Sequence, residues 1–178
     1  MLKIIKEDLI KYSEDKTGIF IVHVVNAGNS MGSGVAKALF EKWSKVKTNY
    51  HKWFDGDNTN CSGNATLGNI QFVRVDEGYK NQFVVNMIGQ DYPGGHTFNI
   101  NSKQIHLPPV RYKSLEKCML HVAESIFKAK EKTGAVYRII APWFSCGLAG
   151  GDKKTTLDLI NKIWLNNDID VTICDPQL

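Results

Sequence analysis

The chain has 178 residues, of which 43% are hydrophobic and 22% are charged, and a formal net charge of +4. This length is typical of one domain with a sizeable core, so we expect a single domain over residues 1–178. No apolar run approaches the roughly 18 residues of a membrane span, and the first residues are too charged for a signal peptide. We therefore expect a cytoplasmic protein with no membrane partner. The four cysteines are widely spaced and form no CxxC motif, so we expect neither a metal site nor a disulfide framework.

Apolar patterning predicts strands that alternate with helices. Residues 18–25 are a near-continuous β-branched run, typical of a strand that is covered on both faces. From residue 33 onward Val35, Leu39 and Trp43 recur every four residues, which indicates one face of a helical region that ends near residue 54. The other expected elements are strands at 1–5, 66–75, 82–88, 136–141 and 169–174, and helices at 111–132 and 152–165. This alternation favours an α/β sandwich over an all-β fold or a helical bundle.

Residues 90–109 contain two close prolines, a Gly-Gly pair and several asparagines. We predict a loop of roughly twenty residues there, and a loop of this length is often functional. Tyr92 or Phe98 would be able to stack on a ring of a ligand. Asp91 and His96 would be able to supply an acid or a base, although each is better explained as an ordinary loop residue.

Two glycine-containing loops, at residues 26–34 and 145–152, each connect a strand to a helix. Free backbone N–H groups and the positive end of a helix dipole favour an anion at such a loop. Glycine lets the backbone approach phosphate oxygens closely. Neither loop has the Gly-x-Gly-x-x-Gly or Gly-Lys-Ser/Thr patterns of dinucleotide or mononucleotide folds. Both lie at the carboxyl ends of strands, where α/β proteins bind ligands, so together they predict a clamp for a ligand with two phosphates.

These loops resemble those of the macro domain family, whose members bind ADP-ribose. The matching segments are His-Val-Val-Asn at 23–26 followed by Met-Gly-Ser-Gly-Val-Ala at 31–36, and Gly-Leu-Ala-Gly-Gly-Asp at 147–152. The similarity extends over nearly the whole chain and is greatest to a bacterial and phage branch related to ADP-ribose-1″-phosphate phosphatases and terminal ADP-ribose hydrolases. It implies a three-layer α/β/α sandwich with a central mixed sheet and a site that needs no cofactor. The implied ligand is ADP-ribose or a derivative, free or on an ADP-ribosylated macromolecule.

The resemblance also implies a set of ligand-binding residues. Asp8 would accept a hydrogen bond from the adenine amine, although an aspartate at this place serves equally well as a helix cap. The family usually has glycine where this chain has Glu7. Many macro domains cover the distal ribose with an aromatic side chain where this chain has Ala149, so the distal pocket would be more open. The implied set is Asp8, Leu9, Asn26, Met31, Gly32, Ser33, Gly34, Val35, Ser145, Cys146, Gly147, Leu148 and Ala149.

Three residues are candidates for catalysis: Asn26, His23 and Asp152. Asn26 matches the asparagine with which the family holds the distal ribose, although asparagine at a turn is often turn chemistry alone. His23 is a candidate general base, and the phosphatase-like branch also has a histidine here. A lone histidine in an apolar strand is, however, more often a core residue. A regular strand would place His23 and Asn26 on opposite faces.

Asp152 is either the N-cap of the next helix or a catalytic carboxylate. A related hydrolase branch pairs an aspartate of this loop with a lysine nucleophile. In this chain the aspartate is displaced by three positions and residues 89–95 contain no lysine, so the lysine mechanism is disfavoured. Cys146 has no evident base partner, which favours packing over a nucleophilic role.

Two functions stay open at this point. One is a hydrolase that acts on ADP-ribose-1″-phosphate or an ADP-ribosyl adduct, with a water as nucleophile. The other is a reader that binds free or conjugated ADP-ribose without turnover. We favour the hydrolase, because a reader module is usually attached to a domain that it directs. Nucleic acid is not expected as a partner except as a modified substrate, because the lysines are interspersed with glutamates as on solvated helix faces.

Overall fold

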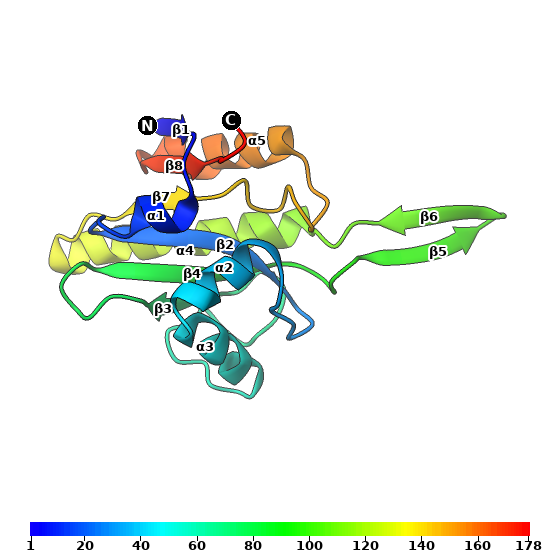
Figure 1. The fold of residues 1–178 in the computed structure, drawn as a ribbon, viewed down its shortest axis with the longest axis horizontal. Coiled ribbons are helices and arrows are strands. Elements are labelled where there is room, and N and C mark those ends of the chain that lie inside the picture. The colour runs from blue at the N-terminus through cyan, green and yellow to red at the C-terminus, as the bar shows by residue number, and fades with distance from the viewer.

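The computed structural model describes residues 1–178 as a six-stranded sheet between two layers of helices, with a separate two-stranded hairpin (Figure 1). The strands are β1 (Leu2–Ile5), β2 (Ile19–Asn26), β3 (Ile70–Arg74), β4 (Gln82–Gln90), β5 (His96–Ile100), β6 (Lys103–Leu107), β7 (Arg138–Ala141) and β8 (Val171–Cys174). The helices are α1 (Leu9–Ser13), α2 (Gly34–Lys42), α3 (Lys45–Phe54), α4 (Tyr112–Thr133), α5 (Lys153–Ile163) and the 3₁₀ helix η1 (Leu165–Asn167).

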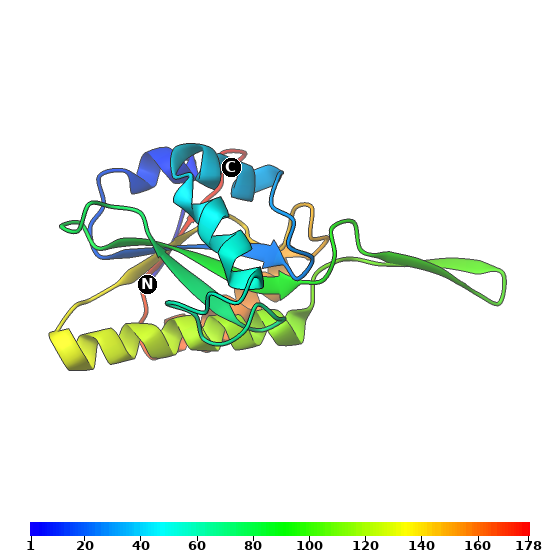
Figure 2. The same ribbon diagram turned by 90° about the horizontal axis from the view of Figure 1, so that it is seen from below.

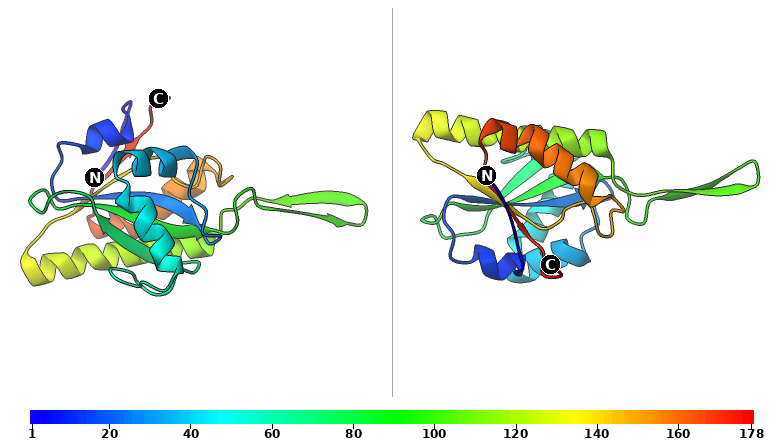
Figure 3. Two further views of the ribbon diagram at one scale, coloured as in Figure 1. Left: turned by 60° about the horizontal axis from the view of Figure 1, so that its bottom comes forward. Right: turned by 90° about the horizontal axis from the view of Figure 1, so that it is seen from above.

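The main sheet has the order β1-β8-β7-β2-β4-β3. Neighbouring strands are parallel except for β3 and β4, which are antiparallel. Figure 2 shows α4 below the sheet and α1 to α3 above it, and Figure 3 shows α5 on the same side as α4. The predicted three-layer α/β/α sandwich with a central mixed sheet is therefore confirmed.

Strand β2 lies at the centre because it is apolar on both faces. Its side chains alternate between two cores, as the pleat of a strand requires. Phe20 and Val22 pack in the core beneath α4 and α5, whereas Ile19 and Ile21 pack in the core beneath α1 to α3. The odd-numbered side chains of β2 therefore face the layer of α1, α2 and α3, and this face is where the candidate site begins.

The helical region predicted from residue 33 is two helices and not one. Trp43 leaves the helical conformation with φ −129° and ψ 89°, which ends α2. The buried side chains of α3 then follow a spacing of their own, at Val46, Tyr50 and Trp53. Of the predicted repeat only Leu39 is buried within α2, whereas Val35 is exposed and Trp43 lies just beyond the helix. Each helix turns its own apolar face towards the sheet.

Helix α4 matches the prediction closely. Its buried side includes Leu115, Met119, Val122 and Ile126, and it ends at Gly134, which adopts the left-handed conformation with φ 72°. Glycine at this place lets the last turn close without a Cβ penalty. None of the helices is both long enough and apolar enough to cross a membrane.

Residues 90–109 are not a loop throughout, because β5 and β6 form an antiparallel hairpin that projects from the body (Figure 1). Asn101 and Ser102 have φ of 49° and 65° at its turn, and tight hairpin turns favour such positive angles. The prolines and glycines at the ends of the segment are typical of a loop, but between them apolar residues alternate with polar ones, as in a β-strand. The apolar side chains that share one face are Phe98, Ile100, Ile105 and Leu107.

The hairpin contributes little to the fold, since all of its strand residues are exposed. Its two ends meet, because a Cβ on Gly95 would lie only 2.1 Å from the carbonyl oxygen of Leu107. We expect replacement of residues 96–107 by two glycines to change the melting temperature by no more than about 3 °C, since little apolar area is lost. Thermal unfolding by circular dichroism checks this, and a loss of cooperative unfolding would contradict it.

Candidate functional site

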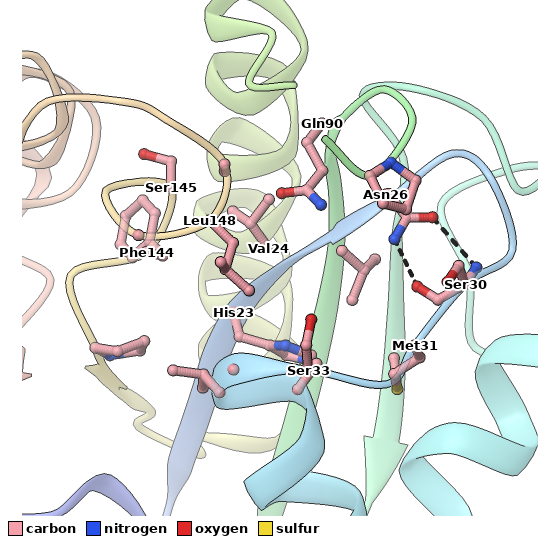
Figure 4. A pocket seen from close by; sticks show the side chains of 18 of the residues that line it. His23, Val24, Asn26, Ser30, Met31, Ser33, Gln90, Phe144, Ser145 and Leu148 are labelled. Carbon is pink, nitrogen blue, oxygen red and sulfur yellow. Dashed lines mark hydrogen bonds between the residues drawn. The ribbon is translucent and has the colours of Figure 1, made fainter. Parts of the chain in front are cut away.

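A cavity of about 590 Å³ lies at the carboxyl ends of β2, β4 and β7 (Figure 4). Both glycine loops contribute to its walls, and so do residues at the end of β2. Open α/β sheets bind ligands at this edge because helices begin there and strands end there. A volume of this size is typical of small-molecule sites.

Asn26 organises the first loop. Strand β2 has a register irregularity between Val25 and Asn26, so the regular alternation that would separate Asn26 from His23 is interrupted. The Asn26 side-chain oxygen accepts hydrogen bonds from the backbone N–H of Gly28 at 2.9 Å and of Ser30 at 3.2 Å, and its amide donates to the Ser30 carbonyl at 2.5 Å (Figure 4). Tyr50 of α3 donates to the Asn26 carbonyl at 2.8 Å. One amide hydrogen of Asn26 has no partner in the protein.

The first loop presents unpaired backbone donors to the cavity. The N–H groups of residues 32–36 have no acceptor within the protein, as expected for the first turn of a helix. The Ser33 side chain at the N-cap of α2 does not cap this turn. Gly34 adopts φ 56°, which L-residues rarely accept. The loop and the start of α2 therefore form a concave cluster of donors at the positive end of a helix dipole.

The second loop repeats this arrangement on the opposite wall. The backbone N–H groups of Ser145, Gly147 and Leu148 have no acceptor within the protein. Ser145 is held at φ 66°, and its hydroxyl lies 3.1 Å from that of Thr156 on α5. A Cβ on Gly147 would meet no atom within 4 Å, so this side of the loop is open. Two donor clusters on facing walls suit an extended anion.

A third segment joins the two loops. Tyr92 packs on Gly28, where an added Cβ would lie 2.8 Å from the ring, and Pro108 packs on Gly150 with a corresponding distance of 2.7 Å. Gln90 and Pro93, from the end of β4 and the turn after it, line the cavity. The residues on either side of the projecting hairpin therefore fix the relative position of the two loops.

His23 lies at the floor of the cavity and is only 1% exposed. Its Nε2 is 2.6 Å from the side-chain oxygen of Asn86 on β4, while its Nδ1 is buried without a partner. Burial lowers the pKa of His23 to about 4, and the hydrogen bond to Asn86 opposes part of this shift. The imidazole is therefore neutral at physiological pH.

Most of the predicted site residues line this cavity. Those that do are His23, Asn26, Met31, Gly32, Ser33, Gly34, Val35, Ser145, Gly147, Leu148 and Ala149, and those that do not are Asp8, Leu9, Cys146 and Asp152. Sequence reasoning missed Gln90, Trp143 and Phe144 among the lining residues. The signal for the two aromatic residues was their position between the end of a predicted strand and the second loop.

The two aspartates among the predicted residues outside the cavity, Asp8 and Asp152, each cap a helix. Asp8 accepts a hydrogen bond from the backbone N–H of Lys11 at 3.0 Å at the start of α1. Asp152 accepts one from the N–H of Thr155 at 2.8 Å at the start of α5. Hydrogen bonds from Thr155 hold the pKa of Asp152 below its ordinary value. No cluster of histidine, cysteine or carboxylate side chains is arranged to hold a metal ion.

No family model and no curated protein matches this chain, but solved structures do. A protein of unknown function from Bacteroides thetaiotaomicron is 27% identical, with a TM-score of 0.80 and 98% of each chain covered. A macrodomain protein from Streptomyces coelicolor is 26% identical, with a TM-score of 0.70, over 98% of this chain and 99% of that one. Thermosipho africanus DarTG, in complex with ADP-ribose, is 14% identical with a TM-score of 0.70, over 99% of this chain and 42% of that one.

These likenesses span the whole sheet and both helical layers. The fold and the two donor-rich loops at the carboxyl ends of its strands define the class of protein. The chain has the macrodomain fold, as its similarity to the S. coelicolor macrodomain protein shows.

Proposed function

We propose that this protein binds ADP-ribose, with the diphosphate held between the two glycine loops. The observation that carries the proposal is the set of unpaired backbone N–H groups on both walls of one 590 Å³ cavity. Neutral donors at a helix start stabilise phosphate oxygens without a lysine or an arginine. The similar structure of T. africanus DarTG, which was solved in complex with ADP-ribose, supports the choice of ligand.

In this proposal the distal ribose lies inside the cavity and the adenine lies beyond it, near α1. The distal ribose would lie beside Asn26, whose free amide hydrogen can reach a hydroxyl. The adenine would extend towards α1, where Asp8 keeps one carboxylate oxygen free of protein partners. A carboxylate suits the adenine amine because it only accepts hydrogen bonds. Trp143 and Phe144 supply apolar surface for the adenosine half.

The finer proposal is hydrolysis at the distal ribose. A water would add across the bond to the group on C1″, which yields ADP-ribose and either phosphate or the released carrier. Asn26 and His23 line the cavity, and in this proposal they position the distal ribose and the water. The two loops hold the charged diphosphate in place. We leave Asp152 outside the reacting centre, because its carboxylate caps α5 and does not line the cavity.

Calorimetric titration tests the binding proposal. We expect ADP-ribose to bind with a Kd on the order of 1 µM and AMP about 100-fold more weakly, because AMP lacks the second phosphate and the distal ribose. The absence of detectable heat with ADP-ribose at concentrations that saturate such a site would overturn the proposal.

Turnover then separates a hydrolase from a reader. Wild-type protein is incubated with ADP-ribose-1″-phosphate and with an ADP-ribosylated protein, and the release of ADP-ribose is followed by chromatography. We expect release by the wild type and at least about tenfold slower release by Asn26→Ala. Binding without any release would identify a reader and would overturn the proposal of hydrolysis.

A further inference from the structure

We infer that Asn86 and Gln71 are positioning residues, which hold His23 with its Nδ1 as a hydrogen-bond acceptor for an O–H group in the cavity. The O–H group belongs to the distal ribose or to a water bound beside it. This inference rests on the proposed function, since it assigns a chemical preference to the floor of the same site.

The three side chains form a polar row across three neighbouring strands. His23 of β2 is in register with Asn86 of β4, and Asn86 is in register with Gln71 of β3. Their exposed fractions are 1%, 0% and 3%. Ile21 and Val73, two positions away on their strands, lie in the apolar core beneath α1 to α3. The three polar side chains therefore lie within an apolar layer. In such a layer an unpaired polar group destabilises the fold, and a hydrogen-bonded one is held in a fixed orientation.

The backbone carbonyl of Asn49, next to Gln71, fixes the direction of the hydrogen bonds along this row. Gln71 Nε2 donates to the backbone carbonyl of Asn49 on α3 at 2.8 Å, and a carbonyl can only accept. Gln71 therefore presents its oxygen to Asn86, whose Nδ2 donates to it at 2.9 Å. Asn86 in turn presents its oxygen to His23 at 2.6 Å. Because that oxygen can only accept, the hydrogen of the neutral imidazole lies on Nε2.

The position of this hydrogen determines what the other ring nitrogen, Nδ1, can bind. With the hydrogen on Nε2, Nδ1 of the neutral ring carries a lone pair and can only accept. It is buried, has no partner in the protein, and belongs to a residue that lines the cavity (Figure 4). An O–H group can satisfy this lone pair, whereas a phosphate oxygen without a proton would be repelled by it. The row therefore makes the floor beside the distal ribose selective for hydroxyl or water.

The test compares two matched substitutions of buried glutamines. Gln71→Met removes the anchor of the row, so the Asn86 amide is free to rotate and the hydrogen of His23 is no longer confined to Nε2. Gln82→Met is the control: Gln82 is 4% exposed at the start of β4, and it donates to carbonyls of residues 13, 14 and 16, away from the row. Nitrogen-15 NMR of the histidine rings at neutral pH, with His23 assigned by a His23→Gln variant, reads the tautomer directly.

We expect the free wild type and Gln82→Met to show His23 with its hydrogen on Nε2 alone. We expect Gln71→Met to show a mixture of the Nε2–H and Nδ1–H tautomers of His23. If the distal ribose supplies the O–H group, Gln71→Met binds ADP-ribose about tenfold more weakly while its affinity for ADP, which lacks that ribose, is unchanged. If the water supplies it, binding is unchanged and turnover falls about tenfold. A wild type with the hydrogen on Nδ1, or a Gln71→Met variant equal to the wild type in tautomer, binding and turnover, would overturn the inference.

These outcomes are distinct from a failure of the proposed function. The tautomer is measured on the free protein and needs no ligand. A wild type that shows the expected tautomer but binds no ADP-ribose would overturn the proposed function, and the ligand role of Nδ1 with it. A wild type that binds ADP-ribose but carries the hydrogen on Nδ1 would overturn the positioning role alone.

Discussion

Gly32→Asp is expected to weaken ADP-ribose binding at least about 100-fold without unfolding the protein. Gly32 lines the cavity, and a Cβ added there would meet no atom within 4 Å. The new side chain therefore has room, but its carboxylate lies among the donors proposed to hold the diphosphate. A like charge placed against a bound anion costs several kcal/mol, which corresponds to two or more orders of magnitude in Kd.

The matched control is Gly32→Asn, which has nearly the same shape and no charge. It should lose much less affinity than Gly32→Asp, and raising the ionic strength should reduce the difference between the two variants. Calorimetry gives the affinities, and thermal unfolding verifies that both variants fold. Equal affinities for Gly32→Asp and the wild type would place the diphosphate elsewhere.

Asp76→Asn is expected to lower the free energy of unfolding at pH 7 by about 2–3 kcal/mol. Asp76 follows β3, and its side chain is only 3% exposed. Its carboxylate holds the turn between β3 and β4 in place by accepting several hydrogen bonds. The donors are the backbone N–H groups of Gly78, Lys80, Asn81 and Gln82 and the guanidinium of Arg74. An amide in its place can accept at one oxygen only.

The stabilisation by Asp76 should decrease as the pH is lowered. Burial by itself would raise the pKa of Asp76, but the hydrogen bonds from the turn and the Arg74 charge outweigh it and hold the pKa well below its ordinary value of 3.8. Because the folded pKa lies below the unfolded one, the stabilisation is complete above the unfolded value and is lost as the pH falls through the folded pKa. The stability curves of wild type and Asp76→Asn should therefore begin to converge as the pH falls below about 4.

Denaturant unfolding at several pH values measures the effect. Asp57→Asn is the control, because Asp57 is an exposed aspartate whose carboxylate accepts hydrogen bonds from Thr59 only, and its replacement should change stability only slightly. If the difference between wild type and Asp76→Asn were the same at pH 3 and pH 7, the charge of Asp76 would not be the source of its contribution.

The local sequence was sufficient to predict most single elements of this fold. The apolar run of β2, the inner face of α4 and the stop at Gly134 follow from periodicity and from the conformational freedom of glycine, all of which act within a few residues. The hairpin of β5 and β6 was missed because glycines and prolines at its ends were given more weight than the alternation between them. Its Asn101-Ser102 turn was a local signal as well.

The candidate site was only partly predictable for the same reason. Both glycine loops are contiguous segments, so their role as an anion clamp could be inferred from spacing and from the strand and helix on either side. Gln90 and Trp143, by contrast, come from strand ends far apart in the chain. Only the order of the strands brings them together.

The sequence by itself determined the α/β class, the two donor-rich loops and the resemblance to macro domains, because each depends on short-range pattern. Tertiary structure alone decided the environment of His23. In the sequence it is a polar residue with apolar neighbours on both sides, as are Gln71 and Asn86 in their strands. Strand register places these three side chains in one row, and the carbonyl of Asn49 fixes the direction of its hydrogen bonds. Local pattern carries no information about which residues of different strands stand opposite one another, because register is set by the packing of the whole sheet.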